Sequence, residues 1–512
     1  MKKLFIYSLL AAGLAVSSCE TDLDIDNPNR PTTAVFWQNA QHAQQGVNAV
    51  YSTFHRPGFS RLLPFLTIIR SDLGASYSPN PALANAIDKF IQPNYNLWET
   101  ATLWHELYVG INRANQVLDN VPSIQMDETK KQQLLGEAKF LRGLFYYQLA
   151  SLWGNVPILL KTPSPEDVPE QATQEQVWAQ VQKDLTEAAA ALPATYANPA
   201  DMGRATKGAA NALLAKVYMQ DGKYDEALTP LQWLVEGEGR NIYSLVPNYR
   251  DNFLSTTENN RESVFEIQFA INPVETTDND IATPDQNYGT SIAKFFSPPP
   301  AGFEDAEALR WGTREFLKER TVNNQRDPRL EATYLYDSTD VRGPLFSRVY
   351  GQAWAIRYNI NHPFRSRVWF RKFLNDATQN TEGFRSPNNW RYIRYADVLL
   401  MYAEALNAVG RTTDAYQYVD RVRQRAGLAR LTDVKPNLSQ TAFLEQIKHE
   451  RITELAGEGH RWNDLARWGD LGPQLANRDP AFARFEVGKH ELLPIPQRDV
   501  DINPNIEQNP NW

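Results

Sequence analysis

The sequence predicts a mainly α-helical protein, all-α in class, in which a scaffold of antiparallel helix pairs carries a loop-rich subdomain. Three observations lead to this prediction. Apolar residues recur with the 3.6-residue period of a helix over residues 34–54, 97–121 and 127–153. Two later segments share one helix-pair spacing. Residues 240–390, in contrast, are rich in Pro, Asn, Asp and Thr and hold only short β-prone runs.

The N-terminus predicts an export signal followed by a lipid anchor. Lys2 and Lys3 precede an apolar run that is too short to span a bilayer. The run ends at Cys19, the only cysteine of the chain, and residues 16–19 resemble the lipobox at which bacterial lipoproteins are cleaved and acylated. We expect residues 1–18 to be a signal peptide and residues 19–33 a lipidated, acidic and proline-containing tether. The alternative is a plain signal peptide with an incidental cysteine.

Residues 34–239 form an N-terminal helical region in this prediction. The helix over residues 127–153 has signals at both ends. Asp127, Glu128 and Thr129 supply the small polar and acidic residues that satisfy the free N–H groups of a first turn, and residues 154–157 (Gly-Asn-Val-Pro) end the helix. The end signals therefore agree with the apolar period.

The helix pairs have the spacing of tetratricopeptide hairpins. Small residues occupy equivalent positions in the two units, Ala215 and Ala227 in the first and Ala403 and Ala415 in the second. Small side chains let two antiparallel helices approach closely, although two unrelated amphipathic hairpins are the alternative. Because the units lie far apart in the chain, we expect a discontinuous scaffold: residues 34–239, then the loop-rich residues 240–390, then a C-terminal helical region over residues 391–512.

Composition and motifs exclude several functions. The chain has 52 Lys and Arg against 60 Asp and Glu, a formal charge of −8, so we expect no nucleic-acid partner. Its seven histidines form no metal-binding pair, and it has no nucleophile elbow, phosphate loop or dinucleotide fingerprint. We expect no cofactor, no metal and no enzyme activity, although the carboxylate pair of a glycoside hydrolase converges from distant positions and stays open.

Five segments, in order along the chain, resemble the SusD/RagB family of outer-membrane nutrient-binding lipoproteins of Bacteroidetes. They are residues 137–157, 205–218, 393–405, 450–468 and 493–510. The resemblance implies a helical, tetratricopeptide-like fold, display on the outer face of the outer membrane by a lipid anchor only, and a partner transporter. That partner is a TonB-dependent barrel of the SusC type. The implied cargo is an oligosaccharide or polysaccharide, and some relatives handle peptides.

Candidate ligand-binding residues come from physical reasoning, because the family's variable loops carry no motif that can be matched here. Flat aromatic rings stack on the C–H faces of sugars, and the chain has 13 Trp and 22 Tyr. Rings that lie among turn-forming residues are the candidates, with one carboxylate nearby: Asp72, Tyr77, Tyr95, Trp98, Tyr288 and Trp311. Trp104 and Tyr108, four residues apart inside a helix, are expected in the core, and Arg461, Trp462 and Asp464 are expected to pack and form ion pairs.

The function that these observations favour is a cell-surface lipoprotein that binds a glycan and delivers it to the transporter. Two alternatives come from other classes of protein. A surface glycoside hydrolase would release reducing sugar, and a repeat scaffold would bind only proteins. A peptide-binding relative of the same family is a third alternative.

Overall fold

The computed structural model describes residues 36–512 except 93, 165, 272–287, 338–347 and 360. The predicted signal peptide (residues 1–18) and the predicted tether (residues 19–33), which begins with Cys19, therefore lie outside the described residues. The long helices are α3 (Ala40–Tyr51), α4 (Trp98–Asn120), α5 (Glu128–Trp153), α6 (Gln174–Ala191), α7 (Lys207–Gln220), α8 (Tyr224–Val235), α13 (Tyr395–Ala408), α14 (Thr412–Arg425) and α16 (Gln440–Leu455).

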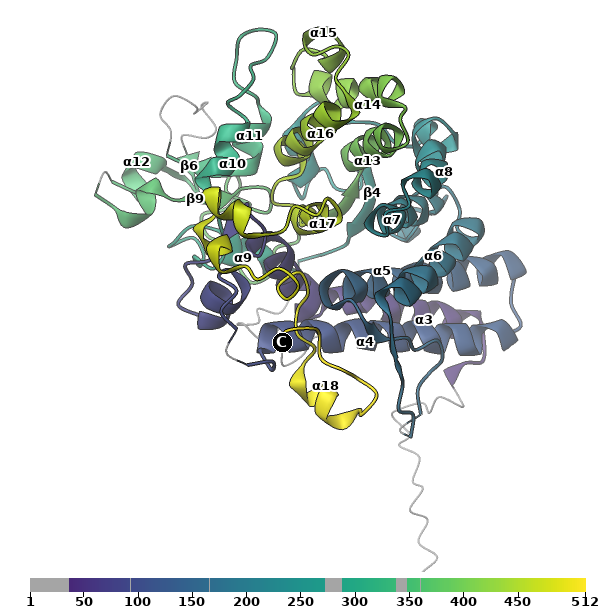
Figure 1. The fold of residues 1–512 in the computed structure, drawn as a ribbon. Coiled ribbons are helices and arrows are strands. Elements are labelled where there is room, and N and C mark those ends of the chain that lie inside the picture. Colours follow the sequence, from purple (N-terminus) through teal and green to yellow (C-terminus); the bar gives the residue numbers. More distant parts are fainter. Residues whose placement is uncertain (1–35, 93, 165, 272–287, 338–347, 360) are drawn as a thin grey trace, which may run out of the picture.

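These helices pack in an order that follows the chain. Helix α4 packs on α5, α5 on α6, α6 on α7 and α7 on α8, and α8 then packs on α13, which contacts α14 and α16. In Figure 1 these helices form one curved row, in which α3 to α8 and the later helices α13, α14 and α16 make a single scaffold. The mainly α-helical prediction is confirmed.

The two predicted hairpins are α7–α8 and α13–α14. Ala215, Ala227, Ala403 and Ala415 have no exposed surface, as expected for small residues at close helix crossings. The turn glycine of each hairpin has a positive φ, +74° at Gly222 and +82° at Gly410, a region in which residues with a Cβ are strained. The repeated spacing in the sequence therefore arises from a repeated packing geometry.

Helix ends also follow their sequence signals. Asp127 caps α5, and its Oδ1 accepts a hydrogen bond of 2.8 Å from the Lys130 N–H. Gly154 at the C-terminal end has φ +72°, and its N–H donates to the Ala150 carbonyl. Helix α6 begins at a capping box made by Thr173 and Gln176.

Two parts of the chain consist mostly of short elements: the segment between the two halves of the scaffold, and the C-terminal part of the chain. The short helices are α9 (Ile292–Phe296), α10 (Arg310–Glu315), α11 (Arg329–Thr333), α12 (Trp354–Arg357), α15 (Leu431–Val434), α17 (Arg461–Arg467) and α18 (Gln497–Ile502). In Figure 1, α9 to α12 gather on the left, opposite the helical row, and α18 lies at the bottom.

Every strand of the described chain belongs to an antiparallel pair. The pairs are β1 (Gly74–Ala75) with β5 (Glu307–Ala308), β2 (Val156–Pro157) with β3 (Gln171–Ala172), β4 (Ser263–Ile267) with β10 (Trp390–Arg394), β6 (Tyr334–Tyr336) with β9 (Val368–Phe370), and β7 (Arg348–Val349) with β8 (Gln352–Ala353). The β1–β5 and β4–β10 pairs join segments that are distant in sequence, so they anchor the loop-rich part to the helices.

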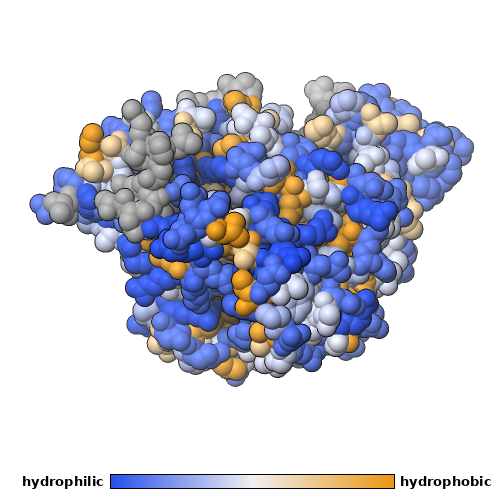
Figure 2. All heavy atoms as spheres, turned by 90° about the horizontal axis from the view of Figure 1, so that it is seen from above, coloured by the Kyte–Doolittle hydropathy of each residue, from blue (hydrophilic) through white to orange (hydrophobic). Residues whose placement is uncertain are grey.

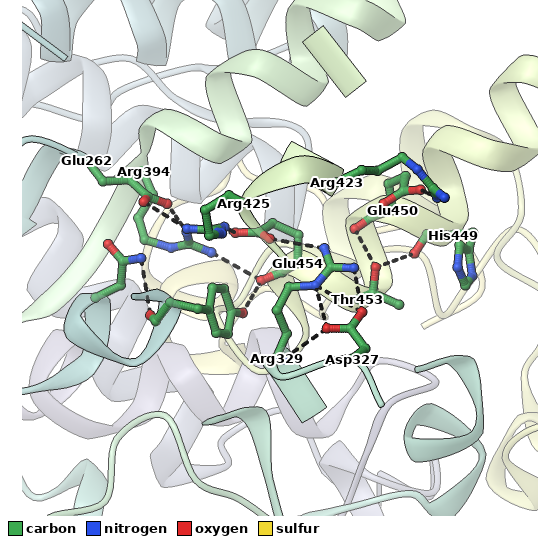
Figure 3. Close-up of polar contacts among 12 residues, drawn as sticks. Glu262, Asp327, Arg329, Arg394, Arg423, Arg425, His449, Glu450, Thr453 and Glu454 are labelled. Atoms are coloured by element: carbon green, nitrogen blue, oxygen red, sulfur yellow. Dashed lines mark hydrogen bonds and ion pairs between the residues drawn. The ribbon is translucent and has the colours of Figure 1, made fainter. Parts of the chain in front are cut away.

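A buried network of charges ties α16 to both parts of the fold (Figure 3). Glu454 of α16 pairs with Arg329 at the start of α11 (3.2 Å) and with Arg394 at the end of β10 (3.0 Å). It also pairs with Arg425 at the end of α14, and Glu262 contacts the same Arg394 and Arg425. Such side chains are stable in the interior only when each charge has a partner. The network therefore fixes the loop-rich part on the scaffold.

The motif around residue 460 is structural, as predicted. Arg461 pairs with Asp72 (2.7 Å), Asp464 pairs with Arg451 (2.8 Å), and Trp462 has no exposed surface. Trp462 is part of a small second core with Phe90, Leu465, Leu471, Leu475, Phe482 and Phe485.

The view from above shows a face that is mostly hydrophilic, with small and separate apolar spots (Figure 2). Exposed aromatic rings occur at a few positions of the described chain. Three of them define the candidate site.

Candidate functional site

Three exposed aromatic side chains belong to segments that the fold brings side by side. Tyr77 follows β1 and is 53% exposed, Trp98 opens α4 and is 38% exposed, and Phe303 precedes β5 and is 41% exposed. We call Tyr77, Trp98 and Phe303 the aromatic face. Exposed apolar surface is unfavourable in water, so exposed rings in neighbouring segments are candidates for contact with a ligand.

Hydrogen bonds hold the three segments together. The β1–β5 pair places the loop after β1 beside residues 303–308, and Ser78 Oγ donates a hydrogen bond to Asp305 Oδ1. Asn80 Nδ2 donates to Glu99 Oε1 at 3.0 Å, which joins the same loop to the first turn of α4. The aromatic face is thus assembled from three distant parts of the sequence.

Each ring of the aromatic face has a cation against it. The guanidinium of Arg61 lies 5.0 Å from the centre of the Trp98 ring, that of Arg367 lies 4.7 Å from Tyr77, and Lys294 Nζ lies 5.0 Å from Phe303. A cation over a ring face contributes about 0.5–1 kcal/mol at an exposed site and fixes the orientation of the ring. The rings are therefore held in place before any ligand arrives.

Carboxyl groups surround the cation that lies over Tyr77. Arg367 Nη1 lies 2.7 Å from Glu304 Oε2 and also 2.7 Å from Glu307 Oε1. Burial raises the pKa of Glu307 to about 8, although Arg367 opposes the shift. Burial and the neighbouring Asp479 likewise raise the pKa of Asp88, close to Tyr77, to about 7. Burial therefore favours the uncharged forms of both Glu307 and Asp88.

Asp72 is a correction to the predicted site. Its carboxylate has no exposed surface, and its two oxygens accept hydrogen bonds from Arg461 at 2.7 and 2.8 Å, with Arg478 at 3.1 Å. A buried carboxylate needs such partners, so Asp72 holds the C-terminal region against β1 and does not reach a ligand. Trp311 is half-buried, with its Nε1 donating to the Asp72 carbonyl and Arg478 at 4.8 Å over its ring.

Tyr95 and Tyr288 lie in other surroundings. Tyr95 is half-buried against Trp512, with ring centres 6.0 Å apart, and its carbonyl accepts a hydrogen bond from the Gln497 N–H. Tyr288 is 47% exposed and contacts His55, with ring centres 6.0 Å apart. Of the predicted residues, the structure brings Asp72 and Trp311 into contact, and it places Tyr77 and Trp98 in segments that are hydrogen-bonded to each other.

Sequence reasoning missed Phe303 and the three stacking cations, Arg61, Arg367 and Lys294. Phe303 had a usable signal, because it follows Gly302 directly after the proline run 298–300, in the kind of turn-rich setting that selected the other rings. Arg61 and Arg367 had none, because each reaches its ring from a segment distant in sequence, whereas Lys294 lies in the same stretch of chain as Phe303.

Two negative findings hold for the part of the chain that the structure describes. No group of three or more His, Cys, Asp or Glu side chains is placed to hold a metal ion. No helix there combines the length and the apolar character needed to cross a bilayer.

Comparison with known proteins agrees with the fold. The model of the SusD family matches residues 174–512, and a second model, described as starch-binding and associating with the outer membrane, matches residues 75–219. A SusD-like protein of Formosa agariphila is 27% identical over 95% of this chain and 94% of its own. The starch-binding protein SusD of Bacteroides thetaiotaomicron is 24% identical over 80% of this chain and 78% of its own.

Solved structures show the same architecture. A SusD superfamily protein from Bacteroides vulgatus has a TM-score of 0.80 at 25% identity and covers 93% of this chain and all of its own. A laminarin-binding SusD-like protein has a TM-score of 0.75 at 28% identity with the same coverage. The helix-pair scaffold with its inserted loop-rich part is thus the SusD-like architecture. The chain belongs to the SusD family.

Proposed function

We propose that this protein is a cell-surface lipoprotein that binds an oligosaccharide on the aromatic face and passes it to a TonB-dependent transporter of the SusC type. The observation that carries the proposal is the set of three exposed rings, each fixed by a cation, in neighbouring segments with polar side chains. Sugar rings stack their C–H faces on aromatic rings and leave their hydroxyls to polar groups. Ser78, Asn80 and Glu304 border the rings.

An uncharged glucan is the ligand class that we propose. One relative is named as starch-binding and another as laminarin-binding, and both starch and laminarin are uncharged glucose polymers. Arg367 of this surface is paired with Glu304, and burial favours the uncharged form of Glu307, so neither group requires a charged ligand.

A binding panel tests the proposal. Calorimetry with laminarin, starch oligosaccharides and a set of peptides should show binding to at least one glucan and none to the peptides. Tyr77→Ala and Phe303→Ala should each weaken glucan binding by about 1–3 kcal/mol, as expected when an anchoring ring is lost. Trp233→Ala is the control, because it removes a half-buried ring stacked by Lys207 (5.3 Å) on α8 of the scaffold.

Three results would contradict the proposal. Binding of peptides alone would make the protein a peptide-binding relative. Release of reducing sugar by the purified protein, abolished by one Asp or Glu substitution, would make it a glycoside hydrolase. Failure to bind any member of the panel while a transporter still co-purifies would make it a scaffold for proteins only.

The lipid anchor and the outer-membrane location are part of the same proposal. They rest on the lipobox at Cys19 and on the description of the matching family model as associating with the outer membrane. Cys19→Ala should release the protein from the membrane fraction of cells that lack the partner transporter, with its melting temperature unchanged. Retention of the variant in that fraction would refute anchoring through Cys19.

A further inference from the structure

A cleft of about 950 Å³ lies beside the aromatic face. One wall is the N-terminal half of α4, from Trp98 to Tyr108. The second wall comes from residues 157–159 and 167–169, which precede α6, and the third from residues 496–506, which include α18. Its volume is at the upper end of the range of about 300–1,000 Å³ for pockets that enclose most of a small ligand.

Hydrogen bonds between the walls hold the cleft open. Asn503 Nδ2 donates to the Pro169 carbonyl at 2.8 Å, and the Arg498 N–H donates to Asn96 Oδ1 at 3.2 Å. The Tyr108 hydroxyl donates to the Pro157 carbonyl at 3.0 Å. The C-terminal segment is therefore fixed at both ends, and a ligand would meet walls that need little rearrangement.

The lining combines rings with hydrogen-bonding groups. Trp98 and Tyr108 border the cleft, and Trp104, only 3% exposed, forms its floor; the expectation that Trp104 is buried is confirmed, whereas Tyr108 is half-buried. His105 and Asp499 lie among these rings. Burial lowers the pKa of His105 and raises that of Asp499, and both shifts favour uncharged forms.

Trp98 links the cleft to the aromatic face. It belongs to both, with Arg61 at 5.0 Å over its ring on one side and the cleft on another. We propose that the cleft is a second sugar-binding subsite, which takes the continuation of the glucan chain held on the aromatic face. This inference rests on the proposed function, and it adds that the protein selects longer chains over shorter ones.

The polar groups among the rings favour a sugar over a protein segment in the cleft. An apolar protein anchor would cover His105 and Arg498 without supplying hydrogen-bond partners, and unpaired polar groups covered by a ligand lower its affinity. Sugar hydroxyls donate and accept hydrogen bonds and so satisfy both. Val168 and Ile502, exposed on the rim, are the feature that a protein partner would use instead.

The test compares short and long oligosaccharides of laminarin, or of starch if the panel selects starch. The wild type should bind the long chains about tenfold more tightly than the short ones, the scale of one additional anchoring contact. Ala101→Trp places a ring in the cleft one helical turn after Trp98 and should abolish the gain with length, while leaving the affinity for short chains unchanged. Val434→Trp adds the same ring to an exposed position on α15 and is the control.

A second variant protects the test from a folding defect in Ala101→Trp. His105 and Arg498 are exposed side chains, and replacing both with Ala removes hydrogen-bonding groups from the cleft without adding bulk. It should reduce the gain with length and leave the melting temperature unchanged.

Several outcomes would overturn the inference. Equal affinity of the wild type for short and long chains would do so, as would an unchanged gain with length in both cleft variants. Unchanged sugar binding together with loss of the transporter from Ala101→Trp would identify the cleft as a protein-docking site. Absence of any glucan binding by the wild type would refute the proposed function itself.

Discussion

The Trp98→Ala variant tests whether Trp98 contacts the ligand or packs in the core. Trp98 is the first residue of α4 and 38% exposed, and its ring lies against Arg61. The substitution removes one cation–ring contact, about 0.5–1 kcal/mol, and part of the apolar burial of a large ring. We expect a loss of unfolding free energy of about 1–2 kcal/mol in total. Removal of a fully buried Trp costs about 3–5 kcal/mol.

Glucan affinity should change more than stability. Loss of a ring that stacks on the ligand costs about 1–3 kcal/mol of binding free energy, which makes the dissociation constant roughly fivefold to more than a hundredfold larger. Because stacking is mainly apolar, salt should scarcely change the affinity of the wild type. Calorimetry and thermal melting by circular dichroism on the same protein samples give the two quantities.

Trp153→Ala is the comparison for a core tryptophan, because Trp153 has no exposed surface. It should melt much lower than Trp98→Ala and bind glucan normally per folded molecule. If Trp98→Ala melts as low as Trp153→Ala and binds glucan with wild-type affinity, then Trp98 is a packing residue and the aromatic face is wrongly assigned.

Three further predictions concern the scaffold. Ala403→Leu should destabilise the protein by about 1–3 kcal/mol, because Ala403 is fully buried at the α13–α14 crossing and a larger side chain forces the helices apart. Arg394→Met should cost about 3–5 kcal/mol, since it removes a cation that pairs with each of the buried Glu262, Glu454 and Glu458. His460, whose pKa is lowered to about 4 by burial and by Lys216, should make the wild type lose up to about 3 kcal/mol as the pH falls from 6.5 to 4, because the unfolded chain takes up a proton that the folded chain excludes.

Denaturant unfolding measures the free energy of unfolding in all three cases, and each case has a matched control variant. Ala408→Leu adds the same bulk at an exposed end of α13, and Arg411→Met breaks an exposed ion pair with Asp414; both should change stability by less than about 0.5 kcal/mol. His460→Gln should flatten the pH dependence over the same window. An Arg394 variant as stable as its control, an Ala403 variant with an unchanged midpoint, or a pH profile unaffected by His460→Gln would each refute the corresponding argument.

The most recognisable family motif, residues 450–468, is accounted for by packing. Glu454 and Glu458 meet the arginine and lysine side chains that hold the loop-rich part, Arg461 meets Asp72, and Trp462 fills the second core. These side chains are constrained by the geometry of buried charge pairs, which admits few substitutions. In our proposal the ligand is contacted elsewhere, on loops where such constraints are weaker.

The sequence by itself determined the helical scaffold. Helix periods, caps and the small residues of the two hairpins are local signals, and local hydrogen bonds and close helix crossings respond to them directly, as at Asp127, Gly222 and Ala403. The same local reasoning selected Tyr77 and Trp98, which are exposed, but also Tyr95 and Trp311, which are half-buried.

Only the tertiary structure decided which rings share a surface. The segments of Tyr77, Trp98 and Phe303 lie side by side because β1 pairs with β5 and Asn80 bonds to Glu99, contacts between segments that no periodicity relates. The same contacts decided the fate of Asp72. From the sequence its carboxylate was a candidate ligand-binding group, but in the structure it is buried and paired with Arg461, which is distant in sequence. A charge is available to a ligand only when no partner has neutralised it in the fold, and partners distant in sequence become visible only in three dimensions.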